Sequence, residues 1–250
     1  MTKHVTSMTI FDAEHYTPEQ RQAIIDSYPL HERDARTKGI PMLGSGRVFP
    51  IAEECIAVEP FQAPDWWVWI GGMDFGIDHP FAAVRMGWDR DDDVLYVTAE
   101  YRVKGEIPPV HAAACKRWGA TMPWAWPHDG LQRDKGSGEA LRDQYQLQGL
   151  NMLAERAQYP DGGTGVEAGL MEMLERMRTN RWKVFSTCKL WLEEFRMYHR
   201  KDGMVVKLQD DLISASRYAS MMHRFARPNR AAGRPQYASQ APYDPLRWRG

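Results

Sequence analysis

The spacing of apolar and polar positions changes along this chain and predicts where its regular elements lie. The run WWVWIGGMDFG, from Trp66, is densely apolar and aromatic, which predicts a buried strand that ends near Asp74. Two more strands are predicted at residues 81–88 and 94–103, joined by the turn-forming segment DRDDD. Together these segments predict an antiparallel meander.

After the meander, helical spacing alternates with short apolar strands. Helices are predicted at about residues 109–118, 138–148, 166–179, 189–198 and 211–225, short strands at 123–127, 151–154 and 182–185, and a hairpin-like segment at 201–208. This order predicts an α/β fold, in which a mixed central sheet of an antiparallel meander plus parallel strands is flanked by helices. It is the order of elements in an RNase H-like domain.

Both ends of the chain differ from this central part. Five prolines after the first helix interrupt residues 1–66, so we expect an extension or strap with one helix, which begins at Pro18 and is capped by Thr17. Residues 67–225 are expected to form the RNase H-like domain. Residues 226–250 are rich in Pro, Gly and Arg, which predicts a basic, disordered tail.

Composition excludes some classes of protein but does not identify one. The 32 Lys and Arg against 33 Asp and Glu give a net charge of −1, which leaves room for a locally basic groove. The three cysteines form no CxxC pair, so neither a zinc site nor a disulfide framework is predicted. Since no run of about 18 apolar residues occurs, we expect no membrane segment and a cytoplasmic location.

Two aspartates end apolar strands in the predicted sheet. Asp74 is followed by Phe75 and Gly76, and Asp129 is followed by Gly130. If the two strands are neighbours, both carboxylates project at one edge of the sheet. Unpaired carboxylates are costly to bury, and divalent cations favour clusters of them. A turn-capping role is the alternative for Asp74.

A third source of carboxylates is the pair Asp210 and Asp211, which precedes a helix with one apolar stripe. Two acids at a helix N-terminus are stabilised by the helix dipole, so capping alone would explain them. As part of a three-acid set from distant segments, they instead fit two-metal phosphodiester cleavage with Mg²⁺ or Mn²⁺.

Several neighbours of these acids are candidates for supporting roles. Asp78, His79 and His128 are candidate outer ligands or proton carriers, although Asp78 as a turn cap and His128 as a plain hydrogen-bonding residue are the simpler interpretations. A nuclease must also hold a polyanionic backbone near its own acids. The candidate DNA contacts are Arg133, Lys135 and Arg217.

Four segments together carry a resemblance to a known family: HERDARTKGIPMLGSGRVFP at 31–50, GGMDFGIDHPFAA at 71–83, WPHDGLQRDKGSG at 126–138 and DDLISASRYA at 210–219. In order and spacing they resemble the C-terminal, RNase H-like nuclease domain of the large terminase subunit of tailed bacteriophages and prophages. The resemblance covers nearly the whole chain.

This resemblance implies a metal-dependent endonuclease that cuts concatemeric viral DNA during genome packaging. It assigns the first metal ligand to Asp74, the second to Asp129 and the third to the Asp210/Asp211 pair. Many relatives carry a further aspartate where this chain has Ser214, so the third ligand stays open, with Asp211 ranked before Asp210.

The resemblance also implies partners: double-stranded DNA, the terminase small subunit, the ATPase domain and the portal or procapsid, in the cytoplasm of the bacterial host. No GxxxxGK[ST] loop occurs, so no ATPase site is expected in this chain, which predicts a fragment or a split gene product. Two other functions remain: a non-catalytic docking module for the motor or portal, and another RNase H-like nuclease such as a junction resolvase.

Overall fold

The computed structural model describes residues 9–13, 15–28, 33, 37, 46–76, 79–133, 138–201, 204–206 and 210–228. Two predicted site residues, Asp78 and Lys135, lie outside the described residues, as does most of the predicted tail. Within the described part, no helix is both long and apolar enough to cross a membrane.

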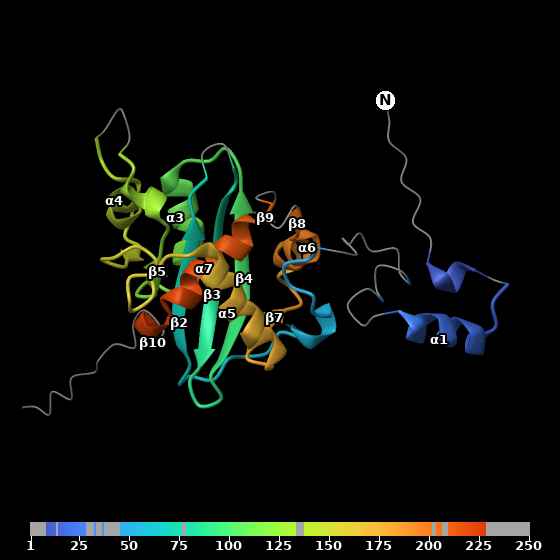
Figure 1. Ribbon diagram of the computed structural model, residues 1–250. Helices are drawn as coiled ribbons and strands as arrows, with labels where there is room; N and C mark the ends of the chain where they lie inside the picture. Colours follow the sequence, from blue (N-terminus) through green and yellow to red (C-terminus); the bar gives the residue numbers. More distant parts are fainter. Residues whose placement is uncertain are drawn as a thin grey trace, which may run out of the picture.

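A mixed sheet of eight strands organises the chain (Figure 1). Its centre is the predicted meander, in which β2 (Val68–Asp74), β3 (Phe81–Asp89) and β4 (Val94–Val103) pair antiparallel. Parallel strands extend it in the order β1-β7-β4-β3-β2-β5-β6, with β1 at Ala57–Val58, β5 at Pro123–Ala125, β6 at Asn151–Met152 and β7 at Trp182–Phe185. The predicted fold class is confirmed.

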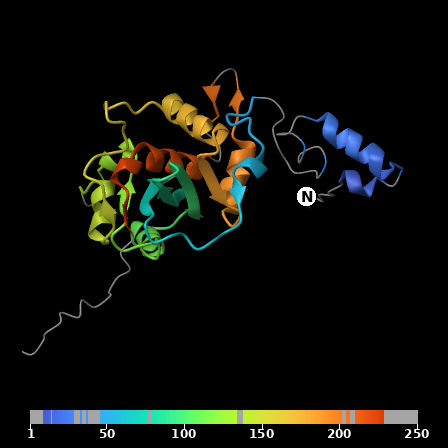
Figure 2. The same cartoon turned by 90° about the horizontal axis from the view of Figure 1, so that it is seen from below.

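Helices cover both faces of this sheet (Figure 2). On one face lie α5 (Val166–Arg178), α6 (Lys189–Met197) and α7 (Asp211–Met221), and on the other lie α3 (Pro108–Lys116) and α4 (Leu141–Leu147). Successive residues of β2 and β3 alternate between the two cores, as the alternation of side chains along a strand requires.

The predicted last helix is too long at its end. It was expected to reach Phe225, but α7 ends at Met221 and a short 3₁₀ helix follows. The chain then returns to the sheet as β10 (Arg227–Pro228), which pairs antiparallel with β2. Pairing with β2 therefore overrides the helical spacing, which continues past Met221.

The N-terminal extension has two different parts. In the first, α1 (Pro18–Ser27) has the predicted cap, since the Thr17 hydroxyl accepts from the backbone N–H of Gln20 at 3.3 Å, and α1 has no buried residue. In the second, Phe49 and Ile56 are buried in the core beneath α5, α6 and α7, and β1 pairs with β7. The second part of the extension thus contributes to the sheet domain.

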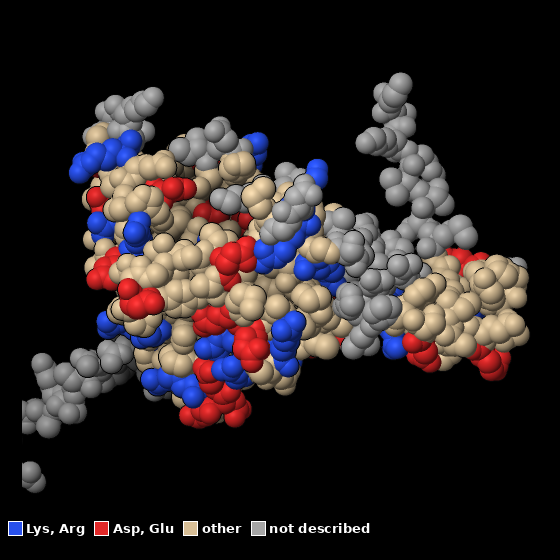
Figure 3. Space-filling model, in the orientation of Figure 1, with Lys and Arg blue, Asp and Glu red and all other residues tan. Residues whose placement is uncertain are grey.

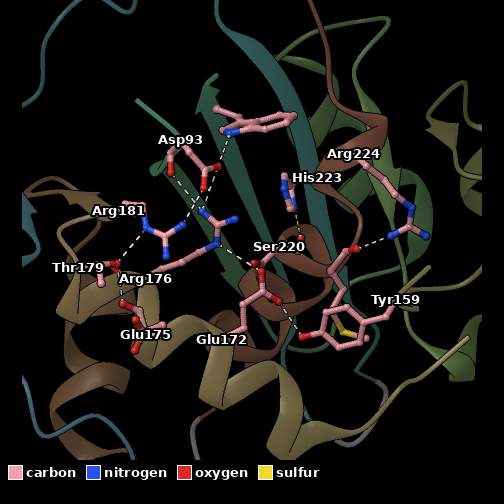
Figure 4. A network of polar contacts seen from close by, with 12 residues as sticks. Asp93, Tyr159, Glu172, Glu175, Arg176, Thr179, Arg181, Ser220, His223 and Arg224 are labelled. Atoms are coloured by element: carbon pink, nitrogen blue, oxygen red, sulfur yellow. Dashed lines mark hydrogen bonds and ion pairs between the residues drawn. The ribbon is translucent and has the colours of Figure 1, made fainter. Parts of the chain in front are cut away.

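A polar network joins α5 to the turn between β3 and β4 (Figure 4). The buried guanidinium of Arg176 donates to the carbonyl and the carboxylate of Asp93, at 3.2 and 3.3 Å, and to Glu172 at 3.3 Å. Arg181 donates to the same Asp93 carboxylate at 2.8 Å, and the Tyr159 hydroxyl donates to Glu172 at 2.8 Å. The network fixes α5 at the end of the meander opposite to Asp74.

Candidate metal centre

The structure brings the two strand-end aspartates to one edge of the sheet. Strands β2 and β5 are parallel neighbours, with Gly72 opposite Ala125, which meets the condition under which both aspartates project at one edge. Asp74 ends β2, and Asp129 lies in the 3₁₀ helix His128–Leu131, just after β5. Asp74 is partly buried, whereas Asp129 is exposed.

Two glycines let helix and sheet approach closely beside Asp74. A Cβ atom on Gly72 would lie 2.0 Å from the carbonyl oxygen of Ala215 in α7. On the other face, a Cβ atom on Gly71 would lie 2.3 Å from the ring of Trp124. Because Gly72 has no side chain, α7 packs directly on β2 and its first residue, Asp211, lies near the end of that strand; Gly71 makes room for Trp124 of the neighbouring strand.

The carboxylates are close enough for their charges to interact. The pKa of Asp74 is raised to about 8, first by burial and then by the negative charges of Asp211 and Asp210, with a further contribution from Asp129. The positive charge of Arg217 opposes this rise. Figure 3 shows acidic side chains in a hollow of the surface at the upper end of the sheet, near the start of α7.

The pKa of Asp211 is also raised. Burial is the main cause, and the positive charges of Arg102 and His79 oppose it. Its carboxyl group is therefore held between other acids and two basic side chains.

This donor set fits a hard divalent cation. Mg²⁺ and Mn²⁺ prefer carboxylate oxygens, and a cation placed among them removes the repulsion that raises the pKa of Asp74. Among the described residues, no three Asp, Glu, His or Cys side chains already stand in ligand positions. The charges of these acids thus affect one another, but among the described residues their side chains are not yet arranged around a common metal position.

Helix α7 receives its N-terminal cap from α6. The Glu194 carboxylate accepts from the backbone N–H groups of Leu212 at 2.8 Å and Ile213 at 3.1 Å. The residue that precedes the helix, Asp210, makes no capping hydrogen bond with its side chain. The side chain of Asp210 therefore does not cap α7, while stabilisation of the two acids by the helix dipole stays an alternative.

A cation on the sheet holds this capping carboxylate. Arg102 of β4 donates to Glu194 at 2.5 Å, and the Glu194 side chain is fully buried. Burial raises the pKa of Glu194 to about 7, against the opposing effects of Arg102 and the N–H of Ile213. From the same strand, Glu100 accepts from the N–H groups of Leu190 and Trp191, which caps α6. Carboxylates thus link β4 to α6 and α6 to α7.

Sequence reasoning missed Glu194 and Arg102. One signal was present, because Glu194 lies on the apolar face of α6 between the buried residues Trp191 and Phe195. A charged residue in such a position needs a partner.

The other predicted site residues differ in position. His79 is exposed, and its charge reaches Asp211. His128 is exposed, and its Nδ1 atom contacts the guanidinium of Arg156, in line with a plain hydrogen-bonding role. Arg133 is exposed and donates to the carbonyl of Gly138 at 2.9 Å.

Arg217, predicted as a DNA contact, is buried and does not lie on the surface. Only 4% of it is exposed, and its aliphatic part lies against Gly169 of α5. Its guanidinium carbon lies 4.4 Å from the centre of the Tyr218 ring. In this position its charge balances Asp74, and contact with DNA would require the side chain to move.

The mixed sheet and its flanking helices define an RNase H-like domain. The family model described as the terminase RNaseH-like domain matches residues 71–223, so this chain belongs to that family. A second model, described as the N-terminal part of the T4likevirus-type terminase large subunit, matches residues 1–56.

Individual relatives are similar over most of this chain. The large terminase subunit of Salmonella phage P22 is 48% identical over 249 residues, which cover 98% of this chain and 50% of that protein. The large terminase subunit of Enterobacteria phage LP7 is 49% identical over 223 residues, which cover 88% of this chain and 47% of that protein. The chain spans about half the length of these curated relatives.

Solved structures agree on the fold. The nuclease domain of the P22 large terminase superposes with a TM-score of 0.69 and 45% identity, over 74% of this chain and 96% of that domain. The nuclease domain of the large terminase from bacteriophage SPP1, solved with bound Mn, has a TM-score of 0.50 and 16% identity, over 67% of this chain and 95% of that domain. At this low identity, the second likeness shows the fold alone.

Proposed function

We propose that this chain is a metal-dependent DNA endonuclease that cuts concatemeric viral DNA during genome packaging. The observation that carries the proposal is the convergence of Asp74, Asp129 and the Asp210/Asp211 pair at one edge of the sheet, where their charges help raise the pKa of Asp74 to about 8. Membership of the terminase family supports the packaging role.

The proposed cofactor is a pair of divalent ions, Mg²⁺ or Mn²⁺, held by Asp74, Asp129 and Asp211, with Asp210 as the alternative third ligand. Such ions supply Lewis acidity for the attack of water on a phosphodiester and stabilise charge on the leaving oxygen. The SPP1 domain was solved with Mn, but for this chain the metal proposal rests on its own carboxylates.

The protein's own residues then have distinct tasks. The sheet holds Asp74 on a rigid strand, and the contacts of Glu194 with Arg102 and with α7 hold Asp211 in place. Arg133, exposed after Asp129, is placed to attract a phosphate of the DNA backbone.

The proposed substrate is double-stranded DNA in the cytoplasm of the bacterial host. The proposed protein partners are the terminase small subunit, the ATPase domain and the portal or procapsid, and they rest on the family to which the chain belongs.

Plasmid digestion with titrated Mg²⁺ and Mn²⁺ tests the nuclease proposal. We expect the parent to nick and linearise the plasmid, and Asp74→Ala and Asp129→Ala to lose cutting while circular dichroism shows an unchanged fold. Asp91→Ala, in the exposed turn between β3 and β4, is the matched control and should cut like the parent.

Other outcomes separate the alternatives. Cutting that persists in both the Asp74 and the Asp129 variants would overturn the assignment of the site. A parent that cuts with neither metal would favour a docking module, and selective cutting of four-way junctions would favour a resolvase.

A further inference from the structure

A cavity of about 380 Å³ lies beside the candidate metal centre. Part of its wall comes from residues that directly follow the proposed ligands: Phe75 and Gly76 after Asp74, and Gln132 and Arg133 after the 3₁₀ helix that contains Asp129. The opposite wall comes from α4 and from the loop between β4 and α3. The cavity is therefore within reach of a DNA strand whose phosphate is bound at the proposed metal centre.

Three aromatic rings line the cavity, those of Phe75, Tyr145 and His111, and Phe75 is partly exposed while the other two are buried. The Phe75 and Tyr145 rings stack at 5.1 Å between centroids, Tyr145 and Phe81 at 5.5 Å, and Phe81 and His111 at 4.2 Å. Ile107, on the opposite wall, is 61% exposed. An exposed apolar side chain and a rigid ring stack next to a polar centre are typical of a surface that receives a flat apolar group.

The polar groups of the cavity suit a base better than a phosphate. Gln132 and Gln144 each offer an amide, which donates and accepts hydrogen bonds as base edges do. Among the described lining residues, Arg133 is the one guanidinium, and Glu106 adds a carboxylate that repels phosphate. A groove that follows the backbone would need several cations and no acid.

We propose that this cavity receives one unstacked base of the DNA strand, next to the phosphate that is cut. The inference rests on the proposed nuclease function, because it takes the cut phosphate to lie at Asp74 and Asp129. The volume falls in the range of about 300–1,000 Å³ found for small-ligand sites. Stacking on Phe75, the partly exposed ring at the end of the stack, offsets the cost of taking the base out of the duplex.

This arrangement has a consequence for where the enzyme cuts. Pyrimidine–purine steps such as TA and CA are the most easily unstacked. Cuts should therefore be enriched beside such steps. This enrichment comes from the ease of unstacking and does not require the cavity to select one of the four bases.

The test uses duplexes in which 2-aminopurine is moved one position at a time along one strand. Cut positions are mapped with Mn²⁺, and the fluorescence of the bound duplex is measured with Ca²⁺ in place of Mn²⁺. Stacking between two neighbouring bases quenches 2-aminopurine, and in the cavity the single partly exposed ring of Phe75 would replace both of those neighbours. We therefore expect fluorescence to rise severalfold at the position next to each mapped cut. A duplex with a natural base at that position should then bind the protein about 5-fold to 100-fold more tightly than a duplex with an abasic site there.

Two variants fill the cavity from different elements of the chain, Gln144→Trp from α4 and Ile107→Trp from the loop between β4 and α3. Both should lose the rise in fluorescence and the enrichment at flexible steps. Leu147→Trp is the matched control, since Leu147 is on the same helix, is 70% exposed and lies outside the cavity. Its melting temperature, cutting and fluorescence should match those of the parent.

The outcomes distinguish this inference from the nuclease proposal. If the parent cuts DNA but no position next to a cut becomes fluorescent, the base pocket is wrong and the nuclease stands. The same holds if either filled variant, folded as judged by its melting temperature, gives the parent's cuts and fluorescence. If the parent cuts nothing, the nuclease proposal fails, and this inference fails with it.

Discussion

Replacing Arg102 with methionine removes the cation that holds the buried Glu194 carboxylate, and its effect on stability should depend on pH. In the parent, Arg102 donates to Glu194 at 2.5 Å, while Leu212 and Ile213 donate to the same carboxylate. Methionine keeps much of the side-chain volume of arginine but offers no donor. Glu194 is then left with two backbone N–H groups and no opposing charge.

The magnitude follows from the protonation state of Glu194. Its folded pKa, about 7, is raised above the unfolded value, so the stability that protonated Glu194 contributes is present at low pH and lost as pH rises through 7. At about pH 6 the group is mostly protonated, and the variant loses roughly the 1 kcal/mol of one hydrogen bond. At about pH 8.5 the group is ionised, and loss of its partner costs about 3–5 kcal/mol.

Urea denaturation of parent and variant at these two pH values measures the difference. A suitable control is Arg200→Met, because Arg200 and Glu167 form a pair at the surface, 29% and 60% exposed, whose loss should cost about 1 kcal/mol or less at either pH. An equal loss of stability in Arg102→Met at both pH values would refute this account of Glu194.

Calorimetric titration with Mn²⁺ should show weaker binding in Arg102→Met, because Arg102 lowers the pKa of Asp211 and supports the start of α7.

Three further predictions concern the acidic edge itself. The folded pKa of Asp74 is raised to about 8, so without metal the free energy of unfolding should fall as pH rises through 8. Mn²⁺ should raise the melting temperature more above that pH than below it. Asp74→Asn should remove both effects. Gly72→Ala should cost about 1–3 kcal/mol in urea denaturation and weaken Mn²⁺ binding, because the added methyl group pushes α7 away from β2. Asp211→Asn should weaken Mn²⁺ binding in calorimetry more than Asp210→Asn, and the reverse order would make Asp210 the third ligand.

Much of the fold follows from local patterns in the sequence. The apolar run before Asp74 is buried along nearly its whole length, so its pattern is continuous, and β2 was predicted within two residues. The end of α7 was missed because the pairing of β10 with β2 joins residues far apart in the chain, which no local spacing reveals. The part of the extension that contains Phe49 and β1 enters the core for a similar reason.

The candidate site divides in the same way. Asp74 and Asp129 were selected as candidates because each follows an apolar run that predicts a strand, a feature that can be read from a few neighbouring residues. The structure places Asp74 at the end of β2 and Asp129 in the 3₁₀ helix after β5. Glu194 and Arg102 are separated by 92 positions and meet only through the packing of α6 on the sheet. A search for charged residues on the apolar face of an amphipathic helix would have selected Glu194, but not its partner.

The use of Glu194 as the cap of α7 itself argues for a functional site at the start of that helix. An aspartate at the N-cap normally satisfies the first N–H groups with its own side chain. Here that task falls to a carboxylate from another helix, which is fully buried and whose pKa is raised to about 7. Burial of such a group costs stability that a local cap would not. The arrangement spares Asp210 the capping role and fixes Asp211 beside Asp74, which is what a metal centre requires and a simple helix end does not.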